Sequence, residues 1–231
     1  MLLYSKLFYA GQRIGSAKSA RGILPVVFSH TRPETVIDVG CGVGTWLAVA
    51  GQLGASKISG VEGPWVENNS LASPAIAMNY ADLEQTLPPL GRYDLAICME
   101  VAEHLSPQRA EGLVTDLCGL SDNVLFSAAI VWQGGIGHLN ERMQSYWAAL
   151  FAANGYGACD VVRPAVWDNS NVSYWYRQNC ILYVKGARGV APASLDRRHP
   201  GRFVNPWCVV ELYQRAIRLG LSPQPVAEGS D

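Results

Sequence analysis

A glycine-rich segment near residue 40 has the residue types and spacing of a ligand-binding loop. It reads Asp38-Val39-Gly40-Cys41-Gly42-Val43-Gly44 and follows a short β-branched run. Glycines between a strand and a helix let the backbone approach a ligand closely. A phosphate-binding P-loop would end in Gly-Lys-Ser/Thr, but Gly44 is followed by Thr45 and Trp46. A dinucleotide fingerprint would need a third glycine at position 45, so Thr45 weakens that interpretation as well.

The acidic residue at the end of the first expected strand narrows the choice of ligand. Asp38 can hydrogen-bond a ligand ammonium or a loop amide, whereas it would repel a pyrophosphate. A cofactor that carries an amino-acid tail fits this charge. A glycine turn that only joins strand to helix is the alternative without a ligand.

Two further acids follow the next two expected strands. Glu62 stands 22 residues after Gly40, at the end of the second strand, where a carboxylate can accept both ribose hydroxyls of a nucleoside. Asp82 follows the third strand, where a carboxylate could accept a hydrogen bond from an adenine amino group. Three acids at successive strand ends predict a nucleoside site.

Candidate acceptor-side residues follow the fourth and fifth strands. Glu100, Glu103 and His104 are spaced i, i+3 and i+4, so on one helical turn they would share a face. His138 follows the next strand. Either histidine could act as a general base, because imidazole has the unperturbed pKa closest to neutral pH. A purely structural role is the alternative for each.

The elements that would position these residues alternate between strands and helices, which predicts an α/β fold with a mostly parallel sheet. Residues 158–162 and 179–184 can form a closing antiparallel pair. Asn205, Pro206 and Gly220 bracket a C-terminal helix. The expected strands before the closing pair are 35–39, 57–62, 75–79, 93–98 and 123–128, and the expected core helices are 45–53, 107–120 and 143–154.

The first 33 residues carry five basic residues and no acid, since the first acidic residue is Glu34. N-terminal helices that cover the mouth of the active site are one interpretation. A basic lid that attracts an anionic substrate is a second, and an organelle transit peptide is a third.

Composition excludes several classes of partner. The net charge of -1 gives no general reason to expect nucleic acid or an anionic membrane, so a small molecule is the expected substrate. No run of 18 apolar residues occurs, so we expect no membrane span. The six cysteines lack any C-x-x-C pair, and we expect reduced thiols in a cytoplasmic protein.

The stretch from Val36 to Leu47 resembles motif I of the class I S-adenosylmethionine-dependent methyltransferases. The likeness extends over residues 34–185. It implies a Rossmann-like, seven-stranded sheet of order 3-2-1-4-5-7-6 flanked by helices, with strand seven antiparallel and S-adenosylmethionine across the C-terminal strand ends. The expected parts are a basic N-terminal helical arm (1–33), the methyltransferase core (34–185), a C-terminal extension and helix (186–221) and a flexible tail (222–231). The implied cofactor-binding residues are Asp38, Gly40, Cys41, Gly42, Gly44, Thr45, Trp46, Glu62, Gly63, Asp82, Leu83 and Met99.

The run Glu100-Val101-Ala102-Glu103-His104 resembles the ubiquinone-biosynthesis O-methyltransferases and the plant-type small-RNA 2'-O-methyltransferases. This resemblance implies a divalent cation, Mg²⁺ or Zn²⁺, which would stabilise an acceptor alkoxide. Its implied ligands are Glu100, Glu103, His104 and His138. The Pro-Pro-aromatic motif of methyltransferases that modify nucleic-acid amino groups is absent from this position.

Aromatic and amide side chains between the last two strands suit a polyhydroxylated acceptor, although a packed hairpin is the alternative. The combination of Gln133-Gly134-Gly135 through Tyr146-Trp147 with Trp175-Tyr176-Arg177-Gln178-Asn179 resembles a subgroup of bacterial methyltransferases associated with carbohydrate genes. The candidate substrate contacts are Trp132, Gln133, Tyr174, Trp175 and Arg177.

Together these features predict direct methyl transfer to an oxygen of a small, sugar-like or natural-product acceptor, with His138, His104 and Glu100 as catalytic residues. A small amine is the alternative acceptor, and a carbohydrate or anionic acceptor would each suit the site. A nicotinamide-dependent oxidoreductase would share Gly40, Gly42 and Glu62 but not Thr45. A catalytically idle cofactor-binding protein is a third class. We expect a monomer or a homodimer.

Overall fold

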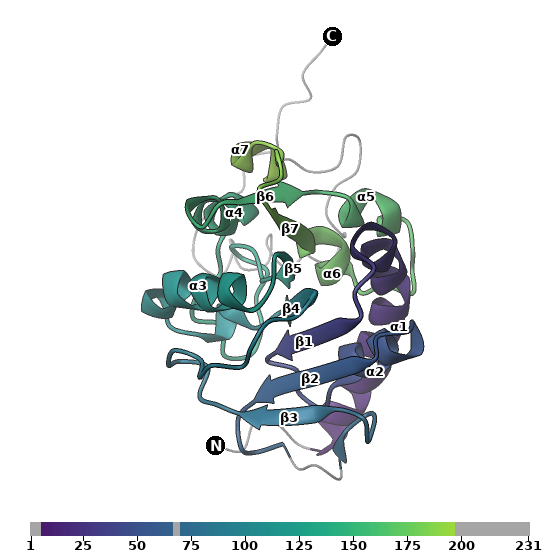
Figure 1. Ribbon diagram of the computed structural model, residues 1–231. Coiled ribbons are helices and arrows are strands. Elements are labelled where there is room, and N and C mark those ends of the chain that lie inside the picture. The colour runs from purple at the N-terminus through teal and green to yellow at the C-terminus, as the bar shows by residue number, and fades with distance from the viewer. Residues whose placement is uncertain (1–5, 67–69, 197–231) are drawn as a thin grey trace, which may run out of the picture. The chain divides into compact units, whose positions relative to one another are not determined.

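A seven-stranded sheet of order β3-β2-β1-β4-β5-β7-β6 forms the centre of the protein (Figure 1). The computed structural model describes residues 6–66 and 70–196. β7 is antiparallel to both of its neighbours, and the other adjacent strands are parallel. The predicted order and the reversed seventh strand are therefore confirmed. The strands are β1 (Thr35–Val39), β2 (Lys57–Glu62), β3 (Ala77–Tyr80), β4 (Leu95–Met99), β5 (Asn123–Ser127), β6 (Tyr156–Cys159) and β7 (Ile181–Lys185).

The central strands are almost continuously apolar because helices cover both faces of the sheet. All five residues of β4 are buried, as are the last four of β1. The register pairs Asp38 with Gly60 on one side and with Ile97 on the other. This alignment brings the ends of β1, β2 and β4 to one edge of the sheet, where their following loops meet.

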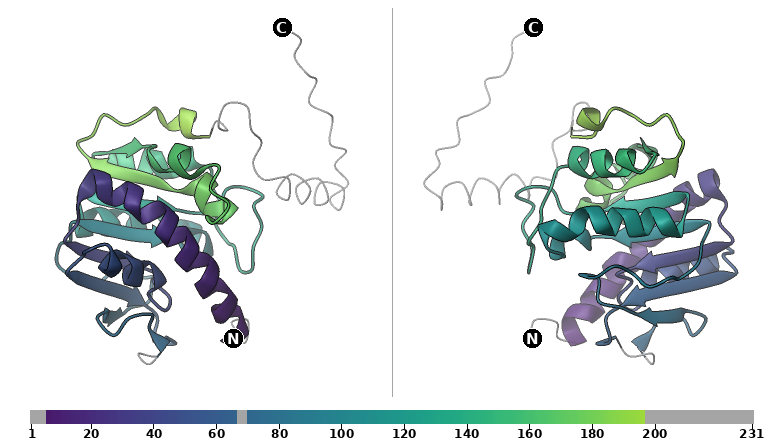
Figure 2. Two further views of the ribbon diagram at one scale, coloured as in Figure 1. Left: turned by 90° about the vertical axis from the view of Figure 1, so that its right-hand side faces the viewer. Right: turned by 60° about the vertical axis from the view of Figure 1, so that its left-hand side comes forward.

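Two hydrophobic cores lie on the opposite faces of the sheet (Figure 2). One contains the apolar faces of α3 (Ala110–Leu120) and α4 (Gln144–Ala153), with the short α7 (Pro192–Leu195) against α4. The other contains α1 (Lys6–Thr31), α2 (Thr45–Gln52), α5 (Val162–Val166) and Tyr176 of α6 (Tyr174–Asn179). β1 contributes to both, since Val36 points to the second core and Ile37 to the first.

α1 is one continuous helix, where the sequence had suggested several N-terminal helices. Ala20, Ile23, Leu24 and Val27 are fully buried and repeat at helical spacing. They pack against α2 and α5, so this part of the helix covers one face of the sheet.

The expected C-terminal helix, the tail and Cys208 lie outside the described residues. The cysteines within them, at positions 41, 98, 118, 159 and 180, are free thiols. In the part of the chain that the structure describes, no helix has both the length and the apolarity needed to cross a membrane.

Candidate cofactor and acceptor site

The glycine loop after β1 adopts backbone conformations that require glycine. Gly40, Gly42 and Gly44 have φ angles of 77°, 52° and 76°. A Cβ atom on Gly40 would lie 2.4 Å from Cγ2 of Val101, and one on Gly44 would lie 2.4 Å from Cδ1 of Ile76. At Gly42, by contrast, no described atom lies within 4 Å of that position. The loop is therefore packed at its two ends and open at its centre, where a ligand can approach the backbone.

Glu62 shapes this loop directly. Its Oε2 accepts a hydrogen bond from the Gly42 N–H at 2.9 Å, and its Oε1 accepts one from the Gly63 N–H at 2.9 Å. Burial raises the pKa of the carboxyl group, and the two backbone amides oppose that shift only in part. Each oxygen keeps a further lone pair for a ligand hydroxyl. The sequence suggested the ligand contact but not this role in ordering the loop.

Asp38 is a second buried acid at the same edge. It is 2 % exposed, and burial together with the nearby Glu62 carboxylate raises its pKa well above the usual value. Among the described residues, the carboxylates that pair with lysine or arginine are Asp116, Asp122 and Asp160. Asp38 and Glu62 thus form an acidic site that a cationic ligand would neutralise.

Four other predicted cofactor residues lie at or after the ends of strands β3 and β4 or in the core. Met99 and Leu83 are buried near the ends of β4 and β3, and Asp82 is exposed after β3. Because β3 is parallel to β2, the Asp82 loop emerges at the same edge as Glu62. Trp46 instead lies in the core, with its ring edge-on to Tyr176 at 5.2 Å.

An exposed tryptophan beside Glu62 was missed by sequence reasoning. Trp65 is 63 % exposed, and its ring lies so close to Gly63 that a Cβ there would be 2.0 Å from it. An aromatic face beside an acid could contact a nucleoside base. The signal was present in the sequence as Glu62-Gly63-Pro64-Trp65.

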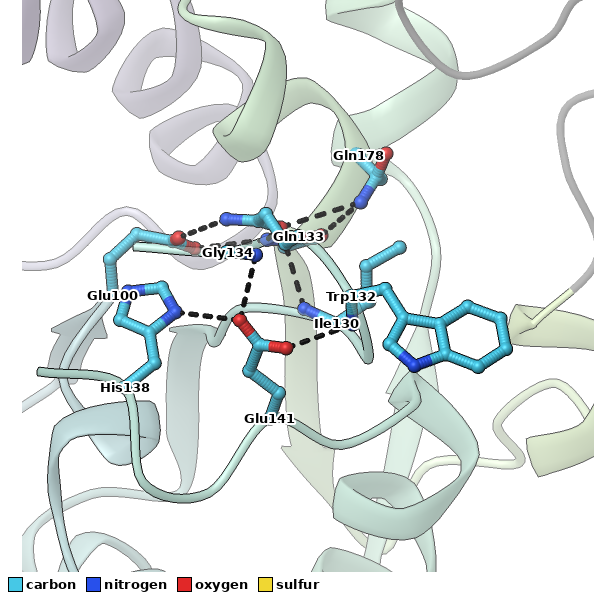
Figure 3. Close-up of polar contacts among 9 residues, drawn as sticks. Glu100, Ile130, Trp132, Gln133, Gly134, His138, Glu141 and Gln178 are labelled. Atoms are coloured by element: carbon cyan, nitrogen blue, oxygen red, sulfur yellow. Dashed lines mark hydrogen bonds and ion pairs between the residues drawn. The ribbon is translucent and has the colours of Figure 1, made fainter. Parts of the chain in front are cut away.

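Glu100 does not continue into the helical turn that its spacing suggested. Its φ angle is 56°, and the 3₁₀ turn η2 (Ala102–His104) begins two residues later. Its carboxylate accepts hydrogen bonds from Nδ2 of Asn179 and Nε2 of Gln133, both at 3.2 Å (Figure 3). The prediction that positions 100, 103 and 104 share one helical face is wrong, because the left-handed backbone at Glu100 turns this side chain toward the amides.

Buried amides surround the Glu100 carboxylate. Oε1 of Gln133 accepts a hydrogen bond from Nδ2 of Asn179 at 2.9 Å, and Oδ1 of Asn179 accepts one from Nε2 of Gln178 at 3.0 Å. Gln133 was expected to contact the substrate, yet its side chain is buried and bonded within the protein. Asn179 was not expected as a site residue, although two consecutive amides before an apolar strand were a signal.

His138 is oriented by Glu141, which sequence reasoning also missed. Nδ1 of His138 lies 2.9 Å from Oε1 of Glu141. The same carboxylate accepts hydrogen bonds from the backbone N–H groups of Trp132 and Gly134, each at 2.8 Å (Figure 3). The imidazole also lies against Gly135, where a Cβ would be 2.2 Å from Nε2. An acid three residues after His138 was the available signal.

Three of the predicted metal ligands do come together. Glu103, His104 and His138 offer ligand atoms that all lie within 4.8 Å of one another, and the two imidazole rings are 4.9 Å apart, edge to face. Glu103 is fully buried, and its carboxylate lies beside that of Glu100. Burial and then the Glu100 carboxylate raise the pKa of Glu103. Burial and then His138 lower the pKa of His104, so its ring is neutral near pH 7.

The remaining substrate candidates lie on two different elements. Trp132 is 62 % exposed with a φ angle of 70°. Tyr174, Trp175 and Arg177 belong to α6, where Trp175 packs against the α1–α2 core and Nη1 of Arg177 donates to the Trp167 carbonyl at 2.9 Å. The segment is a packed helix and not the hairpin considered from the sequence. Contact of these four residues with substrate stays a prediction.

Comparisons with known proteins agree with this geometry. Residues 9–113 match a family described as a methyltransferase domain. No curated protein matches the chain. The fold is similar to magnesium protoporphyrin IX methyltransferase from Synechocystis PCC 6803 with bound SAH, with a TM-score of 0.57 and 17 % identity over 79 % of this chain and 89 % of that one. It is also similar to human N-acetylserotonin methyltransferase in complex with SAM, with a TM-score of 0.51 and 16 % identity over 77 % of this chain and 56 % of that one.

A third similar structure is the methyltransferase domain of bacterial CtHen1-C, with a TM-score of 0.54 and 17 % identity over 75 % of this chain and all of that domain. At these identities the likeness establishes the fold. The family match covers the glycine loop, Glu62 and Asp82, so this part of the chain is similar to a methyltransferase domain. S-adenosylmethionine is the methyl donor expected for such a domain. The acidic glycine loop of this chain suits the ammonium of that donor.

Proposed function

We propose that this methyltransferase modifies a hydroxyl oxygen of a small polyhydroxylated acceptor, with His138 as general base. The observation that carries the proposal is the 2.9 Å contact between Nδ1 of His138 and Oε1 of Glu141. A carboxylate at Nδ1 holds the proton there and leaves Nε2 with a free lone pair. An imidazole held in this tautomer can accept a proton through Nε2.

The reaction would be a direct displacement. The acceptor O–H proton passes to Nε2 of His138 while the oxygen lone pair attacks the methyl carbon of the donor. The carbon–sulfur bond breaks, its electron pair stays on sulfur, and S-adenosylhomocysteine leaves as a neutral thioether. Glu141 then stabilises the imidazolium that forms.

An oxygen acceptor is favoured over an amine because a hydroxyl must lose its proton as it attacks, whereas a neutral amine attacks without prior help from a base. A histidine–carboxylate pair therefore accelerates the attack of a hydroxyl more than that of a neutral amine. The lowered pKa of His104 keeps the adjacent ring neutral, so no second positive charge opposes proton transfer to His138.

Replacing His138 by glutamine should lower kcat for a hydroxylated acceptor by about 10²- to 10⁴-fold, with little change in affinity for S-adenosylhomocysteine. Glu141→Gln should lower kcat by a smaller factor, because the base remains but its tautomer and orientation are no longer fixed. Release of S-adenosylhomocysteine across a panel of hydroxyl and amine compounds measures both effects. His30→Gln, on the exposed end of α1, is the matched control.

A wild-type kcat in the His138→Gln variant would contradict the role of His138 as general base. Methylation confined to the amines of the panel would overturn the choice of oxygen. Either result leaves the donor assignment intact.

A divalent cation is a second candidate, favoured by the closeness of the Glu103, His104 and His138 ligand atoms, which all lie within 4.8 Å of one another. The donor set of one carboxylate and two imidazoles suits such an ion. Glu103, His104 and His138 would hold it, while Glu100 is already bonded to Gln133 and Asn179. The cation would lower the pKa of an acceptor hydroxyl.

Removal of metal ions by a chelator distinguishes general-base catalysis by His138 from catalysis assisted by a divalent cation. With a cation, exhaustive dialysis against a chelator should abolish activity and added Mg²⁺ or Zn²⁺ should restore it. Calorimetric titration of each ion into wild-type protein and into Glu103→Gln gives a readout that needs no acceptor. Unchanged activity after chelation, with no heat of ion binding, would contradict the proposal of a bound cation.

A further inference from the structure

A set of side-chain hydrogen bonds joins the loop after β3 to the turn after β4. Oε1 of Glu84 accepts the backbone N–H of Ser106, and Oε2 of Glu84 accepts the Ser106 hydroxyl, both at 2.8 Å. Hydrogen bonds to a carboxylate are about twice as strong as those between neutral groups. The two segments are therefore held together by both oxygens of a single acid.

A buried arginine, Arg109, also connects the loop after β3 to the segment that follows β4. Nε of Arg109 donates to the Leu83 carbonyl at 2.8 Å, and its Nη2 forms an ion pair with Asp116. Asp116 in turn accepts the Leu87 N–H at 3.1 Å. Gly112 leaves the room that the guanidinium occupies, since a Cβ there would lie 2.5 Å from Nη1. We call Glu84, Ser106, Arg109 and Asp116 the brace.

The contacts continue from the brace to the acceptor side. Ser106 and Arg109 lie two and five residues beyond His104, and the 3₁₀ turn η3 (Pro107–Arg109), which ends at Arg109, leads directly into α3. The carbonyl of Glu103 accepts hydrogen bonds from the N–H groups of Leu139 and Asn140, at 2.7 and 3.0 Å. The residue before Leu139 is His138. Hydrogen bonds and short turns thus run without interruption from the loop after β3 to both histidines.

We infer that the brace couples donor binding to the arrangement of the acceptor side, with Glu84, Ser106 and Arg109 as positioning residues. The loop that they grip contains Asp82 and Leu83, where the adenine of the donor is expected. Ordering of this loop by adenine would be passed to the turn that carries Glu103 and His104. The inference rests on that place for the adenine and is independent of which acceptor is methylated.

Hydrogen exchange measured by mass spectrometry tests the coupling without an acceptor. S-adenosylhomocysteine at saturation should slow exchange in peptides covering 81–92 and 102–109 of the wild-type protein by about 10-fold, within the usual range of coupling between sites. In the double variant Glu84→Gln with Ser106→Ala, the protection of 81–92 should persist and that of 102–109 should be lost. Glu111→Gln, an exposed acid on α3, is the control and should behave as wild type.

Wild-type protection of 102–109 in the double variant would overturn the inference, and so would a wild-type protein in which only 81–92 responds. Arg109→Lys gives a second test, because lysine keeps the charge beside Asp116 but cannot also reach Leu83 with the planar fork of arginine. It should weaken the response of 102–109 while calorimetry still detects S-adenosylhomocysteine binding. Failure to methylate any hydroxyl compound would sink the proposed function and leave these outcomes unaffected.

Discussion

Alanine at position 40 should destabilise the protein and abolish measurable binding of S-adenosylmethionine. The φ angle of 77° would place an L-residue in the left-handed region, at a cost of about 1–2 kcal/mol. The new Cβ would also lie 2.4 Å from Cγ2 and 2.9 Å from Cγ1 of Val101, and such overpacking costs about 1–3 kcal/mol more. Relief requires movement of the β4 end, which carries Glu100. Thermal unfolding and calorimetry with S-adenosylhomocysteine measure the two effects.

Gly91→Ala is the matched control for this substitution. Gly91 has a φ angle of 81°, and no described atom lies within 4 Å of its Cβ position. It therefore carries the backbone strain without the collision and lies away from the cofactor loop. Equal loss of stability in the two variants, or unchanged cofactor affinity in Gly40→Ala, would show that the contact with Val101 is unimportant.

Glu62→Gln should weaken S-adenosylhomocysteine binding by about 100-fold or more, because two hydrogen bonds from ribose hydroxyls to a charged acceptor contribute about 1.5–3 kcal/mol each. The amide would also turn an NH₂ group toward one of the two N–H groups that the carboxylate now accepts, at Gly42 and Gly63. Calorimetric titration gives the affinity, and Glu111→Gln is a charge-matched control. An affinity within about 3-fold of wild type would contradict the ribose contact.

The pH dependence of S-adenosylhomocysteine binding gives a second test of the ribose contact of Glu62. Burial raises the pKa of Glu62, so its carboxylate takes up a proton at a higher pH than an ordinary glutamate. The protonated form offers a poorer acceptor to the ribose hydroxyls. Affinity should therefore fall as pH drops through this raised pKa, beginning above the ordinary value of 4.5, and the fall should be smaller in Glu62→Gln, where only Asp38 still takes up a proton.

The sheet and the donor side were predictable because their signals are local. The β-branched run Thr35–Val39 and the strand Lys57–Glu62 have the bounds expected from the sequence. The acids at their ends need only the rule that neighbouring parallel strands finish at one edge of a sheet. The order of the strands came from the resemblance to a family and not from periodicity.

The acceptor side was less predictable because its contacts join distant residues. Asn179 bonds to Glu100 and Gln133, which lie 79 and 46 positions away in the chain. Spacing along the sequence also cannot show that Glu100 adopts a left-handed backbone, which removes it from the helical face that positions 103 and 104 were expected to share with it. The partnership of His138 with Glu141 is short-range, but it occurs in a loop where no regular periodicity applies.

The single carboxylate of Glu141 accepts hydrogen bonds from His138 and from the backbone at Trp132 and Gly134. The path of the loop and the orientation of the base therefore depend on one residue. Exposed side chains such as Trp132 and Ile136 are free of that constraint. Attempts to redirect this enzyme toward other acceptors can therefore diversify those exposed positions in a combinatorial library, provided that Glu141 and Gly135 are kept.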